Sequence, residues 1–119
     1  MSKMIFVVDD SAVSLAETKE ALKNQYQVMT FISAARMFEA IDNVSPDLIL
    51  LDIEMPDVNG FDVLTKLKEG KKTAHIPVVL LTSMTDNMSI VLGASFGAVD
   101  YIMKPFTPSE LLRRVQKKI

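Results

Sequence analysis

The hydrophobic residues of this chain fall into five short runs, separated by longer segments in which apolar residues recur at helical spacing. Three of the runs are almost continuously apolar, which is typical of parallel strands covered on both faces. The run at residues 27–32 is more polar, which favours a position at the edge of a sheet. The pattern predicts strands at residues 4–8, 27–32, 48–52, 77–82 and 99–103.

Helices are predicted between and after these strands. The segment that follows Ser33 has apolar residues at positions 34, 37, 38 and 41, the spacing of an amphipathic helix. Thr107 and Glu110 form a capping box, with Pro108 at the first helical position. Gly97 suits the left-handed residue that ends a helix. The predicted helices begin at residues 11, 33, 60, 86 and 107. The first ends near residue 24, the third near residue 70 and the fourth near residue 96.

Alternating strands and helices predict an α/β fold with a parallel sheet. In open sheets of this kind the functional site lies beyond the carboxyl ends of the strands. Four of the five predicted strands end on polar or charged residues, and the strand at residues 27–32 does not. The residues at these ends are Asp9, Asp10, Asp52, Thr82, Ser83 and Lys104.

Composition restricts the classes of protein to consider. The 119 residues, 49% of them hydrophobic, fit a single domain over residues 1–119 with one sizeable core. A net charge of −2 gives no reason to expect nucleic acid or an anionic membrane as a direct partner. The absence of cysteine excludes disulfides and thiolate metal sites. No apolar stretch approaches the ~20 residues that span a bilayer, so we expect a cytoplasmic protein.

The polar strand ends predict a phosphoryl-transfer site. Three carboxylates at one end of a sheet repel each other unless a cation lies between them, and Lys104 and a bound metal are the candidates. Oxygen ligands alone favour Mg²⁺. Thr82 and Lys104 supply donors for phosphoryl oxygens. Asp52, at the end of a central strand, is the best candidate for the nucleophile, which leaves Asp9 and Asp10 to hold the metal.

Four motifs carry a resemblance to a known family. They are VVDDS at residues 7–11, PDLILLDIEMPDVNG at 46–60, PVVLLTS at 77–83 and GAVDYIMKPF at 97–106. In this order and at this spacing, the chain resembles the receiver domain of two-component response regulators along essentially its whole length. The resemblance implies a three-layer (βα)5 flavodoxin-like fold, with a parallel five-stranded sheet of order 2-1-3-4-5.

The resemblance also implies a role for each site residue. Asp52 would be the phosphoacceptor, and Mg²⁺ would be held by Asp9, Asp10, Asp52 and the main-chain carbonyl of Glu54. Thr82 and Lys104 would contact the phosphoryl oxygens, and the Lys104–Pro105 bond is expected to be cis.

A conformational switch is implied as well. On phosphorylation Thr82 would move toward the phosphoryl group, and Tyr101 would swing into the space that it leaves. This movement would change the surface formed by the fourth helix, fifth strand and fifth helix, through which members of the family also dimerise. The phosphate donor would be a phosphohistidine on a sensor histidine kinase or histidine phosphotransfer protein. The signal would pass to a downstream protein or an output domain.

Two alternatives compete with this interpretation. One is a receiver-like interaction module that works without phosphorylation, although such modules have usually lost a site residue and this chain has lost none. The other is a Mg²⁺-dependent phosphatase or phosphomutase of the haloacid-dehalogenase type, which places an aspartate where this chain has Glu54. On the main interpretation the chain catalyses only its own aspartyl phosphorylation and dephosphorylation and is not an enzyme with an external substrate.

Two positions are expected to tune the lifetime of the phosphorylated state, namely Glu54 and Met84. Bulky Met84 can shield the acyl phosphate from water, and the acid at position 54 can repel or orient that water. The sign of their combined effect stays open, as does the choice between a stand-alone receiver and a piece of a longer regulator.

Overall fold

The structure is a computed structural model that describes residues 2–56, 58–83 and 87–119. Its main sheet contains five parallel strands in the spatial order β2-β1-β3-β6-β7. The strands are β1 (Met4–Val8), β2 (Gln27–Phe31), β3 (Leu48–Asp52), β6 (Val78–Thr82) and β7 (Asp100–Met103). Because β6 and β7 are the fourth and fifth strands of this sheet along the chain, the predicted order 2-1-3-4-5 is confirmed, with β2 at an edge.

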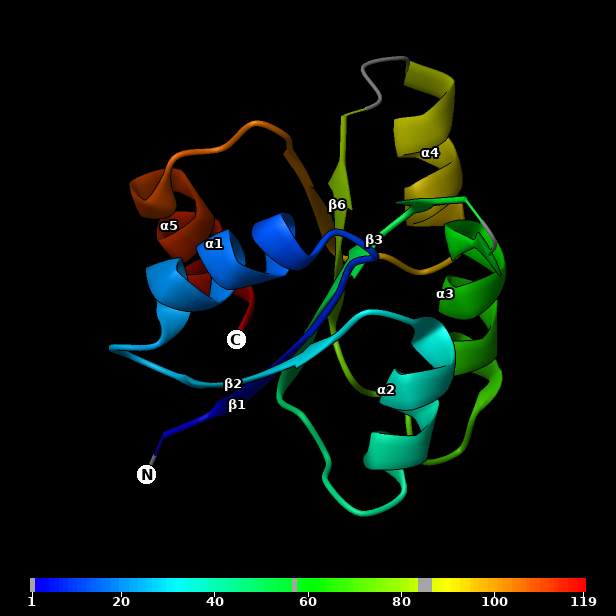
Figure 1. The fold of residues 1–119 in the computed structure, drawn as a ribbon. Coiled ribbons are helices and arrows are strands. Elements are labelled where there is room, and N and C mark those ends of the chain that lie inside the picture. The colour runs from blue at the N-terminus through cyan, green and yellow to red at the C-terminus, as the bar shows by residue number, and fades with distance from the viewer. Residues whose placement is uncertain (1, 57, 84–86) are drawn as a thin grey trace.

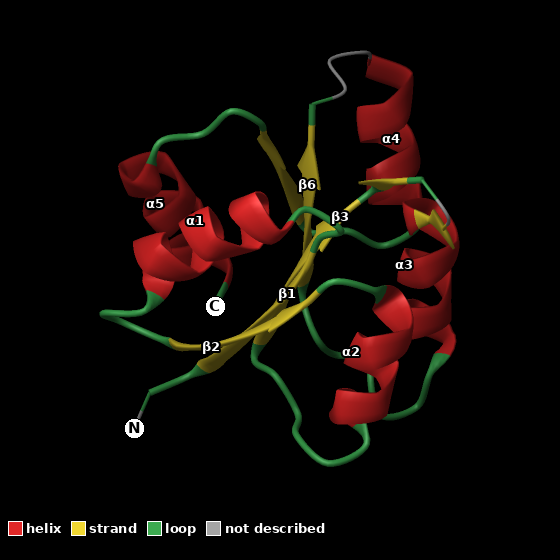
Figure 2. Ribbon diagram, viewed as in Figure 1, coloured by secondary structure: helices red, strands yellow, loops and turns green. Residues whose placement is uncertain are grey.

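Helices cover both faces of the sheet and complete the predicted three layers (Figures 1 and 2). One face carries α1 (Ala12–Leu22) and α5 (Pro108–Lys118). The other carries α2 (Ala34–Ile41), α3 (Gly60–Glu69) and α4 (Asn87–Ser95). None of the helices in the described ranges has the length and apolarity required to cross a membrane.

Three of the predicted helix starts are confirmed by their caps, whereas the predicted start at Asp86 lies outside the described residues. The side chains of Ser11, Ser33 and Thr107 each accept a hydrogen bond from the main-chain N–H three residues further on, which satisfies an otherwise unpaired helical donor. Beyond α4, Gly97 has the left-handed conformation that was expected of it, with φ 104°. The first helix ends at Leu22, slightly before the predicted Asn24.

The hydrophobic core has two parts because the central strands are buried on both faces. In β1 the side chains of Ile5 and Val7 pack toward α1 and α5, whereas Phe6 and Val8 pack toward α2 and α3. Every residue of β3 and β6 is buried as well. The central strands are therefore held from both sides, which fixes the positions of their carboxyl ends.

The segment between β3 and α3 differs from the prediction, which placed no strand there. It contains a short antiparallel hairpin of β4 (Glu54–Met55) and β5 (Val58–Asn59). The hairpin returns the chain so closely that a Cβ atom on Gly60 would lie 2.4 Å from the Cα atom of Ile53. Only glycine fits at this contact, which holds Glu54 beside the end of β3.

Candidate phosphoacceptor site

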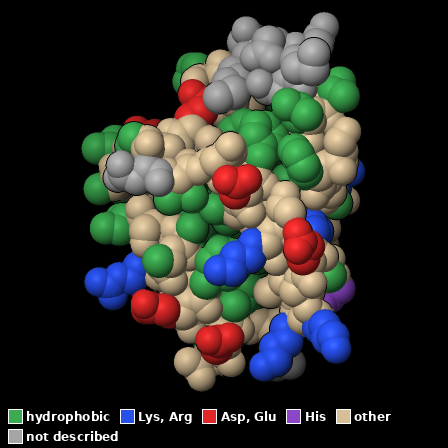
Figure 3. Space-filling view, turned by 90° about the vertical axis from the view of Figure 1, so that its right-hand side faces the viewer, with side chains coloured by type: hydrophobic (Ala, Val, Ile, Leu, Met, Phe, Trp, Pro, Cys, Tyr) green, Lys and Arg blue, Asp and Glu red, His purple; other side chains and the backbone are tan. Residues whose placement is uncertain are grey.

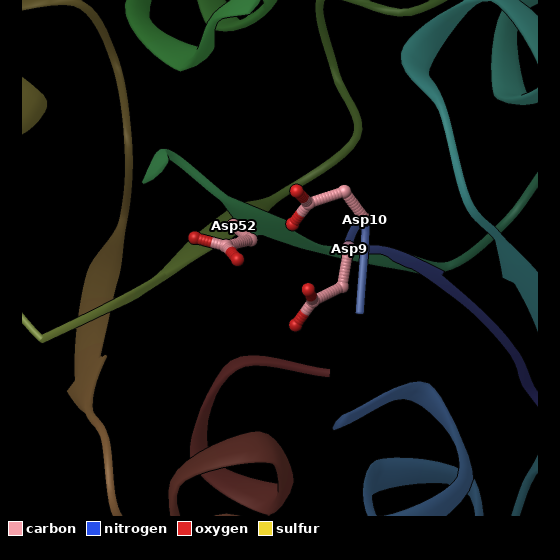
Figure 4. A group of neighbouring side chains, drawn as sticks. All are labelled: Asp9, Asp10 and Asp52. Carbon is pink, nitrogen blue, oxygen red and sulfur yellow. The ribbon is translucent and has the colours of Figure 1, made fainter. Parts of the chain in front are cut away.

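Strand register brings the predicted site residues together at the carboxyl end of the sheet. Val8 lies opposite Leu51 and Asp52 lies opposite Leu81. Asp9, the residue just beyond β1, and Thr82, the last residue of β6, therefore flank Asp52. Carboxylate oxygens of Asp9, Asp10 and Asp52 all lie within 4.8 Å of one another. Figure 4 shows the three side chains directed into a common space.

Among the described residues, Lys104 is the cation that contacts this cluster. Its Nζ donates hydrogen bonds to Oδ2 of Asp9 at 2.7 Å and to Oδ2 of Asp52 at 3.1 Å. The Lys104 main-chain N–H bonds the carbonyl of Thr82 at 2.8 Å, which ties the lysine to the end of β6. The Lys104–Pro105 peptide bond is cis, as expected.

The two buried carboxylates differ in proton affinity. For Asp9, burial favours the neutral form, but hydrogen bonds from Lys104, Ser14 and Ser11 outweigh it and lower the pKa. For Asp52, burial together with the negative charge of Asp9 raises the pKa, despite the Glu54 N–H and Lys104. The pKa of Lys104 is raised because both aspartates stabilise its charge more than burial opposes it. Asp52 is therefore the more basic of the two buried carboxylates.

The cluster has the donor set of a site for a hard divalent cation. Asp9 and Asp52 are 0% and 4% exposed, whereas Asp10 is open to solvent, so a cation could enter from one side and keep some of its waters. The main-chain N–H of Glu54 donates to Oδ1 of Asp52 at 2.8 Å, which places the backbone of residue 54 beside that carboxylate. Carboxylate oxygens without histidine or cysteine suit Mg²⁺.

The side chain of Glu54 makes a contact that the sequence analysis did not predict. Its Oε1 accepts hydrogen bonds from Oγ1 of Thr82, at 3.0 Å, and from the main-chain N–H of Ser83. Its Oε2 accepts one from Oγ of Ser83 at 2.5 Å. The only signal in the sequence is a long acidic side chain two residues beyond Asp52, and that signal does not specify a partner.

Tyr101, the predicted switch residue, is half-buried on the edge strand β7. The guanidinium of Arg114 lies 6.0 Å from the centre of its ring and donates to its main-chain carbonyl at 3.3 Å. Tyr101 and Thr82 both line a cavity of about 220 Å³ beneath α4. Met84, which was predicted to tune the lifetime of the phosphorylated state, lies outside the described residues.

The family model for the response regulator receiver domain matches residues 5–116. The chain belongs to this family. Receiver domains are signalling domains, so this membership confirms the resemblance on which the fold and the class of function were predicted.

Relatives of known name agree with this assignment. The DNA-binding response regulator MtrA of Mycobacterium tuberculosis is 40% identical over 121 residues, which cover 100% of this chain and 51% of the relative. The chain thus spans about half the length of these curated relatives.

Solved structures resemble the chain closely. The receiver domain of DrrB, an OmpR/PhoB homologue from Thermotoga maritima solved in a BeF3-activated form, is 33% identical with a TM-score of 0.88, covering 98% of this chain and 97% of that one. The chemotaxis protein CheY4 of Vibrio cholerae has a TM-score of 0.94 over 100% of both chains at 24% identity, a likeness that concerns the fold alone.

Proposed function

We propose that residues 1–119 form one receiver domain in which Asp52 is the phosphoacceptor. The observation that carries this proposal is the position of Asp52. It is buried at the end of a central strand, contacts Lys104, lies within reach of Asp9 and Asp10, and has a raised pKa. A carboxylate of raised basicity beside a lysine and a cation site is suited to attack phosphorus and form an aspartyl-phosphate.

In the proposed transfer, an oxygen of the ionised Asp52 carboxylate attacks the phosphorus of a phosphohistidine. A phosphorus–oxygen bond forms while the phosphorus–nitrogen bond breaks, and the imidazole leaves with the electron pair of that bond. Lys104 and Thr82 donate hydrogen bonds to the phosphoryl oxygens, and Lys104 keeps its hydrogen bond to Asp9. Mg²⁺, held by Asp9, Asp10, Asp52 and the Glu54 carbonyl, would neutralise part of the charge on the phosphoryl group.

The proposed output is a rearrangement of Thr82 and Tyr101. The cavity beneath α4 offers room for the Tyr101 ring to move inward when Thr82 is drawn toward the phosphoryl group. Tyr101 lies on β7 and contacts Arg114 of α5, next to a surface on which Val91, Phe96 and Met103 are 58%, 41% and 39% exposed. Figure 3 shows hydrophobic side chains gathered in the upper part of the side that carries α3 and α4. Exposed apolar side chains of this kind favour a phosphorylation-dependent protein contact, including a dimer.

The proposed partners follow from this chemistry. A cytoplasmic sensor histidine kinase or histidine phosphotransfer protein would supply the phosphoryl group, and a partner protein or output domain would receive the signal. MtrA is named as a DNA-binding regulator of about twice this length. The proposal that nucleic acid is not bound directly therefore concerns residues 1–119, whose net charge is −2.

Intact-mass measurement tests the proposal. The protein and its Asp52→Asn variant are incubated with acetyl phosphate, with Mg²⁺ or with a chelator. We expect one added phosphoryl group in the wild type with Mg²⁺, and none in Asp52→Asn. If the folded wild-type protein gains no phosphoryl group from acetyl phosphate or from a histidine kinase, the phosphorylation-independent interaction module becomes the better interpretation.

A further inference from the structure

The Glu54 carboxylate occupies hydrogen-bond donors that a phosphoryl group on Asp52 would need. It accepts from Thr82 Oγ1 at 3.0 Å, from the main-chain N–H of Ser83, and from Ser83 Oγ at 2.5 Å. Thr82 follows Leu81, the residue paired with Asp52, so these donors belong to the corner of the sheet next to the phosphoacceptor. A carboxylate and a phosphoryl group are both anions whose oxygens accept several hydrogen bonds, and they suit the same donors.

We propose that Glu54 is a positioning residue that acts as an internal competitor of the phosphoryl group. The inference rests on the proposed function of Asp52. While Asp52 is unmodified, the Glu54 carboxylate holds the Thr82 hydroxyl and Ser83. When Asp52 is phosphorylated, the phosphoryl oxygens take over these donors and Glu54 moves into solvent. The exchange moves hydrogen bonds only, and no covalent bond forms or breaks in it.

Two features of the site support displacement of this side chain. Glu54 is exposed, so its carboxylate can turn into water and be solvated there without a burial cost. Its backbone is held separately, by the N–H bond to Asp52 Oδ1 and by the close contact between Gly60 and Ile53. The side chain can therefore leave while the main chain beside Asp52 keeps its place.

Three substitutions of Glu54 separate competition for donors from simple charge repulsion. Glu54→Ala removes both the charge and the competing oxygens. Glu54→Asp keeps the charge but is one methylene too short for the same contacts. Glu54→Gln removes the charge but keeps a carbonyl oxygen that can still accept from Thr82 and the Ser83 N–H. Glu20→Ala is the control for net charge, because Glu20 is 72% exposed and paired with Lys23 on the surface of α1.

The measurement is the initial rate of phosphorylation by acetyl phosphate with Mg²⁺, followed by intact mass. Competition predicts that Glu54→Ala and Glu54→Asp are each faster than wild type by about tenfold, the value of one charge-assisted hydrogen bond at the low end of its range. Glu54→Gln should lie between wild type and these two variants, because its carbonyl oxygen still competes for the donors but through weaker, neutral hydrogen bonds. Glu20→Ala should equal wild type. The affinity for beryllium fluoride with Mg²⁺, measured by fluorine NMR, should rise in the same two variants.

Other outcomes overturn the inference. Fast Glu54→Gln together with wild-type rates in Glu54→Asp would assign the effect to charge repulsion. Equal rates and equal beryllium fluoride affinities in all variants would assign no role to the carboxylate, while leaving phosphorylation of Asp52 intact. If the wild-type protein itself accepts no phosphoryl group, the proposed function fails, and the inference fails with it.

Discussion

The two halves of the site are built in different ways. The half formed by Asp9, Asp52 and Lys104 contains two buried carboxylates at the ends of central strands, and their charges are matched by short hydrogen bonds from the half-buried lysine. The half formed by Thr82, Ser83 and Glu54 lies at a more open corner and is filled by an exposed side chain from a hairpin. On the proposed function, the difference means that the nucleophile Asp52 is held in place beforehand, whereas the donors at this corner would exchange Glu54 for the phosphoryl oxygens.

The largest change in stability and in phosphorylation rate is expected when the charge of Lys104 is removed. Lys104→Met removes the cation between Asp9 and Asp52 and leaves two carboxylates facing each other. Loss of one partner from a buried ion pair destabilises a protein by about 3 kcal/mol, and loss of a donor to the transferring group lowers its rate about 100-fold. Urea unfolding and acetyl phosphate kinetics measure the two effects.

The matched control for this lysine is Arg114→Met. Arg114 contacts Asp100 at 3.2 Å, and the Asp100 side chain is 18% exposed, against 1% and 6% for Asp9 and Asp52, so the change should cost less, about 1 kcal/mol. An equal loss of stability in the two variants would contradict the view that the ion pairs with buried carboxylates differ from this more exposed one.

A smaller effect is expected from disturbing the hairpin that carries Glu54. Gly60→Ala places a methyl group 2.4 Å from the Ile53 Cα atom, and because main chain cannot move aside cheaply, we expect a loss of about 2 kcal/mol. Gly93→Ala is the control, since the only close contact of its methyl group, at 2.6 Å, would be with the tip of the flexible Leu80 side chain, and it should change stability by less than about 1 kcal/mol. Thermal unfolding compares them, and equal stabilities would show that the hairpin is not tightly held.

The smallest effect concerns the protonation of Asp52. Because its pKa is raised in the folded state, the fold favours the protonated carboxyl, and ionisation of Asp52 at higher pH costs stability. Asp52→Asn should therefore be more stable than wild type above the folded-state pKa of Asp52. This advantage should shrink as the pH falls through that pKa and the wild-type carboxyl becomes neutral.

The measurement is the melting temperature across a pH series with a chelator present, so that no divalent cation alters the charge balance. An Asp52→Asn variant that is less stable than wild type at neutral pH would contradict the assigned direction of the pKa shift.

The sequence predicts the buried half of the site better than the exposed half, for physical reasons. Asp9 and Asp52 end strands that are recognisable as continuous apolar runs, and parallel pairing brings such ends together. The Glu54 side chain contacts Thr82 and Ser83, which lie 28 and 29 positions further along the chain. These contacts depend on the rotamer of a long side chain, which hydrophobic periodicity does not encode. The hairpin of β4 and β5 was missed because strands of two residues carry no alternating pattern.

The most direct test of the account is chemical identification of the phosphorylated residue. An aspartyl-phosphate is an acyl phosphate that borohydride reduces to homoserine, so the modified position can be located by peptide mass mapping. After treatment with acetyl phosphate, Mg²⁺ and borohydride, we expect homoserine at position 52 and unchanged aspartates at positions 9 and 10. Homoserine at position 9 or 10, with Asp52 intact, would contradict the assignment of Asp52 as the phosphoacceptor.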